Sequence, residues 1–548
     1  MAIRYRSARV IAQRGTSLAV SLALAGCAVG PEYHQPKAPP GAFYAPGKLP
    51  AHTASAQGLA GAPQRLDLGA DLKGDWWTLF RSPALDRLVT RALAHNPSLQ
   101  AAQATLLQAR ETARAQQGGF FPVISAAFGY THQQFSTAGF GAVTGAASGT
   151  GVNGQPVSGQ PTSGQPGATG GGAALGAGSG VNSFIPTSNV FDLWNAGVNV
   201  SYTLDAWGGI RRGVEQSLAQ AEYQRFALEA AYLSLTANVV SAAIAEASLN
   251  AQIRATRDVI RAEQDGLKIV AAQLSAGAVT RSVYLQQQAQ LLQTQATLPP
   301  LESSLAQERT ILTAYVGEFP NRSIGAEFDL TDLTLPADLP VSLPSDLVDQ
   351  RPDIRESAAQ LHVATAALGV ATANMLPQIA LSASYGSDGL VIGQLFSGPA
   401  ALAYSIGAAL TQPLFEGGTL LHQKRAAAAA LHAAAANYRQ TVLNAFANVA
   451  ESLQALQYDA KALKLADQAA RAARESLKLQ QVQYSAGSVT YLTVLTAEQT
   501  EQTALITLAK ARAARFADTV SLFQSLGGGW WRRHDVSAKI AACCGLLP

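Results

Sequence analysis

Cysteine and charge are both scarce in this chain. Its 548 residues include only three cysteines, and two of these, Cys543 and Cys544, are adjacent near the C-terminus. That number excludes a framework of disulfides. Charged residues account for 14% of the chain and hydrophobic residues for 48%, so the composition is unlike that of a charged cytosolic surface.

The chain has a net charge of +3, but it lacks a basic face that could bind nucleic acid. Four arginines lie in the first 26 residues, which hold no acid, so the remainder carries about +3 − 4 = −1. No interleaving of basic and aromatic residues occurs, and we expect no nucleic-acid partner. After the N-terminus no run of 18 uncharged, strongly apolar residues occurs, so we expect no membrane-spanning helix.

Motifs for enzyme chemistry are also lacking. Gly149-Thr-Gly151-Val-Asn-Gly154 fits G-x-G-x-x-G, but no strand-to-helix unit surrounds it. His422 and His432 are ten residues apart, which is not a spacing of metal ligands on a helix. We therefore expect no catalytic activity, no metal and no bound cofactor.

The chain contains an internal duplication. Asn96 to Tyr130 matches Arg351 to Tyr385 at an offset of 255, and Leu267 to Thr280 matches Leu477 to Thr490 at an offset of 210. The copies are collinear, and the first holds 45 extra residues. One structural module is therefore used twice.

The N-terminus has the features of a targeting segment. Arginines precede a short apolar run from Leu18 to Leu24, and Ala25-Gly26-Cys27 follows. This resembles a bacterial lipobox, in which Cys27 is lipidated and becomes the first residue. By resemblance to sorted lipoproteins, Ala28 favours the outer membrane. The alternative is an ordinary signal peptide with a chance cysteine.

Four segments alternate between apolar and small or polar residues and predict strands. They are residues 123–130, 197–204, 378–385 and 404–411. Period two with two different faces fits a strand between two environments, such as lipid and water. A soluble sandwich is the alternative, but about 200 helical residues separate the two hairpins. Four strands cannot close a membrane barrel, so the strands must be shared between chains.

Long helices are predicted between the hairpins. From Leu228 apolar residues recur in steps of three, four or seven, with polar interruptions at Glu246 and Glu263. This heptad seam predicts a continuous helix from about Arg211 to Ser275, about 100 Å long. Each long helix then doubles back into a second one, over 281–316 and 491–526.

The helical turns have a common sequence. Ser-Ala-Gly-x-Val-Thr occurs at 275–280 and again at 485–490. Gly277 and Gly487 can adopt the left-handed conformation that ends a helix, and Thr280 and Thr490 can cap the next.

A Gly/Ser-rich stretch, Ser136 to Asn189, holds the 45 extra residues and predicts a disordered loop between two strands. The resulting domain organisation is a signal peptide (1–26), a lipid-anchored segment (27–94), repeat 1 with the insert (95–317), a Pro-rich linker (318–350), repeat 2 (351–529) and a C-terminal tail (530–548).

Several motifs together resemble the TolC-type outer membrane efflux channels, in the NodT-like lipoprotein branch that serves resistance-nodulation-division (RND) pumps. The motifs are Cys27 with Gly30-Pro31-Glu32-Tyr33, the run Trp76-Trp77-Thr78-Leu79-Phe80, the segment Leu343 to Ile354 containing Arg351-Pro352-Asp353, and the segment Leu526 to Trp530.

The resemblance implies a mixed α and β membrane protein that forms a homotrimer. Each chain would give four strands to a 12-stranded outer membrane β-barrel, and its long antiparallel helices would form a periplasmic α-barrel. The implied function is a passive exit duct for small molecules, with an inner-membrane RND pump and a periplasmic adaptor docked at the helix turns. The alternatives are a duct for type I protein secretion and a lipid-anchored coiled-coil spacer without a pore.

The resemblance also implies a gate near the turns. The aspartates of the family correspond here to Val283, Thr493 and Thr496, so no acidic ring is expected. Tyr484 matches a gate tyrosine of the family, with Arg281 as a nearby charge. We therefore expect a closed state held by packing and neutral hydrogen bonds.

Overall fold

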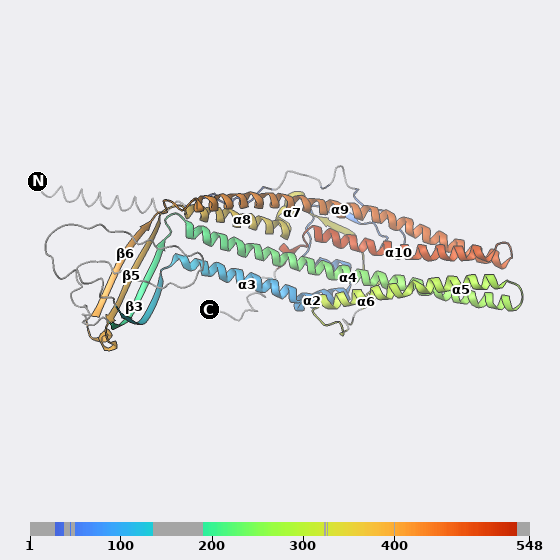
Figure 1. The fold of residues 1–548 in the computed structure, drawn as a ribbon. Coiled ribbons are helices and arrows are strands. Elements are labelled where there is room, and N and C mark those ends of the chain that lie inside the picture. The colour runs from blue at the N-terminus through green and yellow to red at the C-terminus, as the bar shows by residue number, and fades with distance from the viewer. Residues whose placement is uncertain are drawn as a thin grey trace, which may run out of the picture. The chain divides into compact units, whose positions relative to one another are not determined.

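The computed structural model describes residues 28–37, 44, 50–134, 190–322, 325, 327–398 and 401–533. The chain divides into two compact units. One, made of Met1–Gly118, Trp207–Leu376 and Pro413–Pro548, is largely helical, and the other, made of Gly119–Ala206 and Pro377–Gln412, holds a β-sheet. Figure 1 shows the elements of each unit.

All four predicted strands are present, and each is longer than predicted. They are β2 (Val123–Gln134), β3 (Val190–Leu204), β5 (Gln378–Gly389) and β6 (Leu402–Thr411). They form one antiparallel sheet in the order β2-β3-β5-β6, with the short helix η5 (Ile392–Phe396) between the last two in sequence. Within the described residues, the outer edges of β2 and β6 pair with no other strand.

The register places the alternating residues in cross-strand rows. One row is apolar and consists of Ile124, Val200, Ala383 and Ile406. The adjacent row is polar and consists of Ser125, Asn199, Ser384 and Ser405, in which the two serine hydroxyls are 2.8 Å apart. Because side chains alternate along a strand, the sheet has one apolar and one polar face.

The long helices are α4 (Gly209–Ser275) and α9 (Thr419–Ser485), of 67 residues each. At about 1.5 Å per residue, each spans about 100 Å. The predicted return helix 491–526 is α10 (Tyr491–Ser525). The prediction of one continuous helix over 281–316 was wrong: α5 (Arg281–Ala296) and α6 (Leu298–Tyr315) are separate.

The break at Thr297 has a local cause. Pro299 and Pro300 follow one residue later, after Leu298, and proline lacks the N–H that would bond to the preceding turn. Proline is tolerated in the first turn of a helix, which is why α6 starts here.

Shorter helices repeat the duplication. The helices α3 (Pro97–Gln117) and α8 (Pro352–Ala373) each begin with proline and each precede a β-hairpin. Before them lie α2 (Pro83–His95) and α7 (Pro344–Gln350). The described residues also contain short 3-10 helices: η1 (Trp76–Phe80), η2 (Gly118–Phe120), η4 (Leu330–Asp332) and η7 (Trp530–Arg532).

Two segments distant in sequence form a parallel strand pair. The strand β1 (Arg65–Leu68) pairs with β4 (Asp338–Val341). The first lies in the predicted lipid-anchored segment and the second in the predicted linker. Both segments therefore contribute ordered structure to the helical unit.

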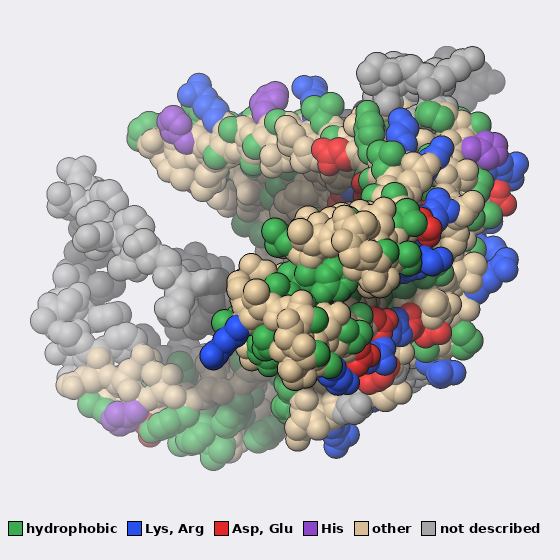
Figure 2. Space-filling view, turned by 90° about the vertical axis from the view of Figure 1, so that its right-hand side faces the viewer, with side chains coloured by type: hydrophobic (Ala, Val, Ile, Leu, Met, Phe, Trp, Pro, Cys, Tyr) green, Lys and Arg blue, Asp and Glu red, His purple; other side chains and the backbone are tan. Residues whose placement is uncertain are grey.

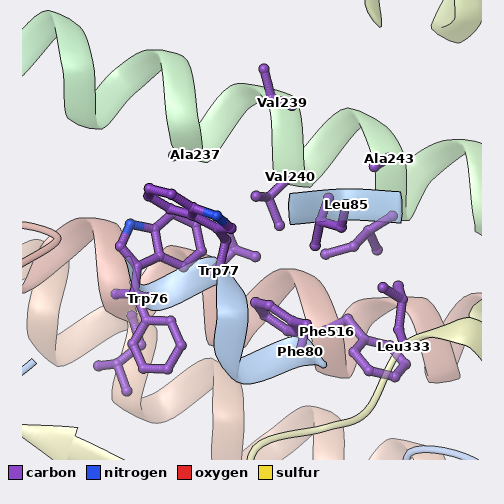
Figure 3. Packing of buried hydrophobic residues seen from close by; sticks show 14 of the residues in the cluster. Trp76, Trp77, Phe80, Leu85, Ala237, Val239, Val240, Ala243, Leu333 and Phe516 are labelled. Atoms are coloured by element: carbon purple, nitrogen blue, oxygen red, sulfur yellow. The ribbon is translucent and has the colours of Figure 1, made fainter. Parts of the chain in front are cut away.

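Aromatic residues of η1 fill the core between α4 and α10 (Figure 3). Trp76 and Phe80 are fully buried, and the ring of Trp76 lies 5.7 Å from that of Phe523. The ring of Phe80 lies 6.2 Å from that of Phe516. The Trp-Trp-x-x-Phe motif thus anchors the segment before α2 to two long helices.

The helix α4 contains an 18-residue window of mean hydropathy 1.4, enough by length and composition to cross a membrane. Because 56% of that window is buried within the protein, its apolar residues have neighbouring helices to pack against. This is the burial expected of a core helix.

Candidate functional site

The two turns that join the long helices to their return helices are built in the same way. Gly277 has a φ of 74° and Gly487 a φ of 75°. In the first turn the N–H of Ala278 donates to the carbonyl of Gln273 at 2.8 Å, and in the second that of Ser488 donates to Gln483 at 3.0 Å. These bonds form a Schellman motif, in which glycine takes the left-handed position. The prediction for both glycines is confirmed.

The threonines of the two turns, Thr280 and Thr490, start the return helices through their backbone conformation. Thr280 and Thr490 occupy the N-cap positions of α5 and α10 in extended conformation, but neither side chain accepts a capping hydrogen bond from a backbone N–H of its helix. The hydroxyl of Thr490 lies 3.2 Å from that of Thr493 instead. The N-cap position was therefore predicted correctly, and side-chain capping was not.

Tyr484 connects the two helical hairpins close to the turns. Its hydroxyl donates to Oε1 of Gln273 on α4 at 3.0 Å. Its ring lies 5.0 Å from that of Tyr491, inclined at 59°, and both tyrosines pack in a small apolar cluster with Val270 and Val494. Tyr484 thus joins α9 to α4 through a neutral hydrogen bond.

A second, buried connection lies farther from the turns. The hydroxyl of Tyr491 on α10 donates to Oε1 of Gln287 on α5 at 2.6 Å. Gln287 in turn donates to the backbone carbonyl of Glu263 on α4 at 3.3 Å. The carboxylate of Glu263 accepts from Thr294 at 2.9 Å and from Gln290 at 3.3 Å. Three helices therefore share one polar network.

Two carboxyl groups of this region were not predicted as site residues. Glu263 is fully buried, and its burial raises its pKa. Glu498 on α10 is 8% exposed; burial, followed by repulsion from Glu263 and Glu501, raises the pKa of Glu498 to about 7. The interruption of the heptad seam at Glu263 was the only signal in the sequence.

The other predicted gate positions carry no acid. Val283 packs against the apolar cluster, Thr493 is partly buried and Thr496 is exposed. Arg281 is exposed and forms no ion pair with any described residue. Figure 2 looks onto the end with the turns, where the nearest atoms are mostly hydrophobic or uncharged and the charged side chains gather to the right.

Two predicted features, the lipidation site Cys27 and the insert 136–189, lie outside the described residues.

Comparison with known proteins decides the family. A family model described as outer membrane efflux protein matches residues 88–318 and 343–528. The chain belongs to the outer membrane efflux protein family. The two matched stretches contain the two copies of the duplicated module, including both long helices and both β-hairpins.

Similar proteins cover most of the chain. The pyoverdine export outer membrane protein OpmQ of Pseudomonas aeruginosa is 29% identical over 458 residues, covering 83% of this chain and 87% of OpmQ. The probable outer membrane lipoprotein SilC of Salmonella typhimurium is 25% identical over 94% of this chain and 98% of SilC. The solved outer-membrane channel OprN has the same fold, with a TM-score of 0.74 at 24% identity over 92% of this chain and 100% of OprN.

Proposed function

We propose that this chain is the outer membrane exit duct of a tripartite efflux system and conducts small molecules passively to the outside. The observation that carries the proposal is a family match spanning both copies of a module that pairs a β-hairpin with a long helical hairpin. One part of this module suits a membrane, and the other suits a long passage through the periplasm.

The sheet supports a shared barrel. Its four strands have one apolar face, and the outer edges of β2 and β6 have no partner strand in the part of the chain that the structure describes. Unpaired edges are not tolerated in lipid, where no water can satisfy the backbone. Three copies joined edge to edge would form a closed barrel of twelve strands.

The helices support the same assembly. On α9, Tyr458, Leu465 and Leu479 are exposed at multiples of seven residues, and on α5 so are Leu285 and Leu292. Exposed apolar residues at heptad spacing are typical of a helix that packs against another helix. We propose that these seams meet between neighbouring copies in a homotrimer with a periplasmic α-barrel.

The partners follow from the duct. A passive channel needs an energy source, which would be an inner-membrane RND pump, and a periplasmic adaptor would dock at the turns around Gly277 and Gly487. The duct itself needs no catalysis and no metal, and its only covalent addition would be a lipid.

Cys27 would carry that lipid in the outer membrane. Support comes from the sequence Leu24-Ala25-Gly26-Cys27 and from the similarity to SilC. Mass spectrometry of the mature N-terminus should find an acylated Cys27 as the first residue. An unmodified chain that starts elsewhere would contradict the anchor but not the duct.

The function is tested in an efflux-deficient host. Expression of the chain with the pump and adaptor encoded beside it should lower the susceptibility of the host to small toxic compounds. Purified trimers should also conduct ions in a planar bilayer. Secretion of a protein without any change in susceptibility would favour type I secretion. A pore-free spacer predicts no β-hairpins, and the sheet argues against it.

A further inference from the structure

Two carboxyl groups lie inside the helical unit near the turns without a counter-charge. Glu263 on α4 is 0% exposed and Glu498 on α10 is 8% exposed. Neither forms an ion pair within the described part of the chain, and Oε2 of each has no hydrogen-bond partner there. A buried ionised carboxylate without a partner is strongly unfavourable, and such groups take up a proton instead.

The surrounding groups supply no positive charge. From α5, Glu263 is faced by the neutral Thr294 and Gln290. On α10 the nearby titratable groups are Tyr491 and Glu501.

On α9 the titratable groups that contact these residues are Tyr484 and Arg474. Tyr484 packs on Tyr491, and Arg474 donates to Glu501 at 3.2 Å. Arg474 is therefore paired with a third carboxylate, Glu501, whose charge adds to the repulsion on Glu498.

The two acids also sit on different hairpins. Glu263 belongs to the hairpin of α4 and α5, and Glu498 belongs to that of α9 and α10. The same two hairpins are joined by the hydrogen bonds from Tyr484 to Gln273 and from Tyr491 to Gln287. Separation of the hairpins would break both bonds and admit water to both carboxyl groups.

We propose that Glu263 and Glu498 form a proton-dependent latch, which holds the two hairpins together while at least one carboxyl group is protonated and releases them when both are ionised. The latch rests on the proposed function, because it regulates the opening of the proposed duct at its periplasmic end.

The sign of the pH dependence follows from burial. The closed arrangement raises the pKa of Glu498 to about 7 from an ordinary value of 4.5. The closed state therefore binds the proton more tightly than a hydrated open state. Closure is fully favoured below the ordinary value and weakens as the pH rises towards about 7. For this one group the open-to-closed ratio should increase about tenfold between pH 6 and pH 8.

The test compares the full-length trimer with its Glu498→Gln and Glu263→Gln variants. Glutamine keeps the size and the hydrogen bonds but cannot ionise. Open probability in planar bilayers, and amide exchange of residues 491–505 corrected for the intrinsic effect of pH, should rise from pH 6 to pH 8 in the parent. Both should stay nearly flat in Glu498→Gln, and should rise less steeply than in the parent in Glu263→Gln, where Glu498 is still buried but no longer repelled by Glu263. Glu475→Gln removes an exposed acid from α9 and should behave like the parent.

Three results separate the possibilities. A parent and a Glu498→Gln variant with the same pH dependence would overturn the latch. So would a response that disappears in EDTA and returns with calcium, since a cation would then neutralise the pair. Absence of conductance at every pH in every variant would contradict the proposed duct, whereas the amide-exchange comparison would still test the latch.

Discussion

At the scale of single residues, two buried acids of the helical unit differ in their hydrogen-bond partners. Glu246 is fully buried, but Arg309 donates to it at 2.9 Å and also pairs with Glu327. Glu263, which interrupts the same heptad seam 17 residues later, has only neutral donors. Burial raises the pKa of both acids, but only at Glu246 does a cation, Arg309, oppose that rise.

Loss of Arg309 should therefore destabilise the helical unit. Arg309→Ala leaves the carboxylate of Glu246 buried without its cation, which costs about 2–3 kcal/mol. The midpoint of thermal unfolding in detergent should fall, and adding Glu246→Gln should restore much of the loss. Arg281→Ala, which removes an exposed arginine, serves as the control. An equal fall of the unfolding midpoint in Arg309→Ala and Arg281→Ala would contradict a special role for the buried pair of Arg309 and Glu246.

Tyr484 should restrain the closed state through a neutral bond and ring packing. Tyr484→Ala removes both the bond to Gln273 and the contact with Tyr491, so single-channel conductance should rise. Tyr484→Phe removes only the hydrogen bond and should have a smaller effect.

Neutral contacts are weakly screened, so the resting conductance of the parent, corrected for bulk conductivity, should change little with salt. A Tyr484→Ala variant that conducts like the parent would remove Tyr484 from the gate. A steep opening by salt would indicate a charged ring instead.

At the scale of elements, the turns depend on backbone conformation alone. A Cβ added at Gly277 or Gly487 would meet no atom within 4 Å, so only the positive φ opposes a side chain there. This separates conformational strain from steric clash, two effects that usually occur together.

Gly487→Ala should cost about 1 kcal/mol in the second turn. Amide exchange of residues 484–492 should then accelerate about fivefold, since 1 kcal/mol corresponds to about that factor. The control is Gly118→Ala, because Gly118 also has open space around it but has a φ of −55°. Acceleration of the same size by an alanine at both sites would contradict the conformational explanation.

The insert 136–189 should be dispensable for assembly. Hairpin connections normally need only a few residues, and the matching connection in the second copy is 45 residues shorter. Deletion of about 45 residues should leave trimers and efflux intact, as judged by native gels and by the susceptibility of the host. External protease should cut whole cells here first. Loss of folding on deletion would mean that the insert packs against the protein.

At the scale of the whole molecule, the exposed apolar residues of α9 provide a test of the proposed trimer. Leu465→Glu combined with Leu479→Glu places two charges in the exposed seam of α9. If neighbouring copies bury this seam, the trimer should weaken at least tenfold in a dissociation series followed by native mass spectrometry. Lys464→Glu, on another face of the same helix, should have little effect. Intact trimers of the double variant would place the contact elsewhere.

Local patterns in the sequence were sufficient for much of this architecture. Alternation predicted the four strands, and the two Gly-containing turns ended α4 and α9 where expected. Both signals are local, since they depend on side-chain period and on the conformational freedom of glycine. The break before α6 also has a local signal, because Pro299 and Pro300 favour the start of a new helix, although a single helix was predicted over 281–316.

Tertiary packing decided the rest. The pairing of β1 with β4 joins segments some 270 residues apart, and no local period specifies such a partner. Glu498 looks like any polar residue of a helix until α10 packs against α4, and its raised pKa exists only after that burial. Periodicity assigns a residue to an element and a face, whereas the loss of water around a charge depends on every element that covers it.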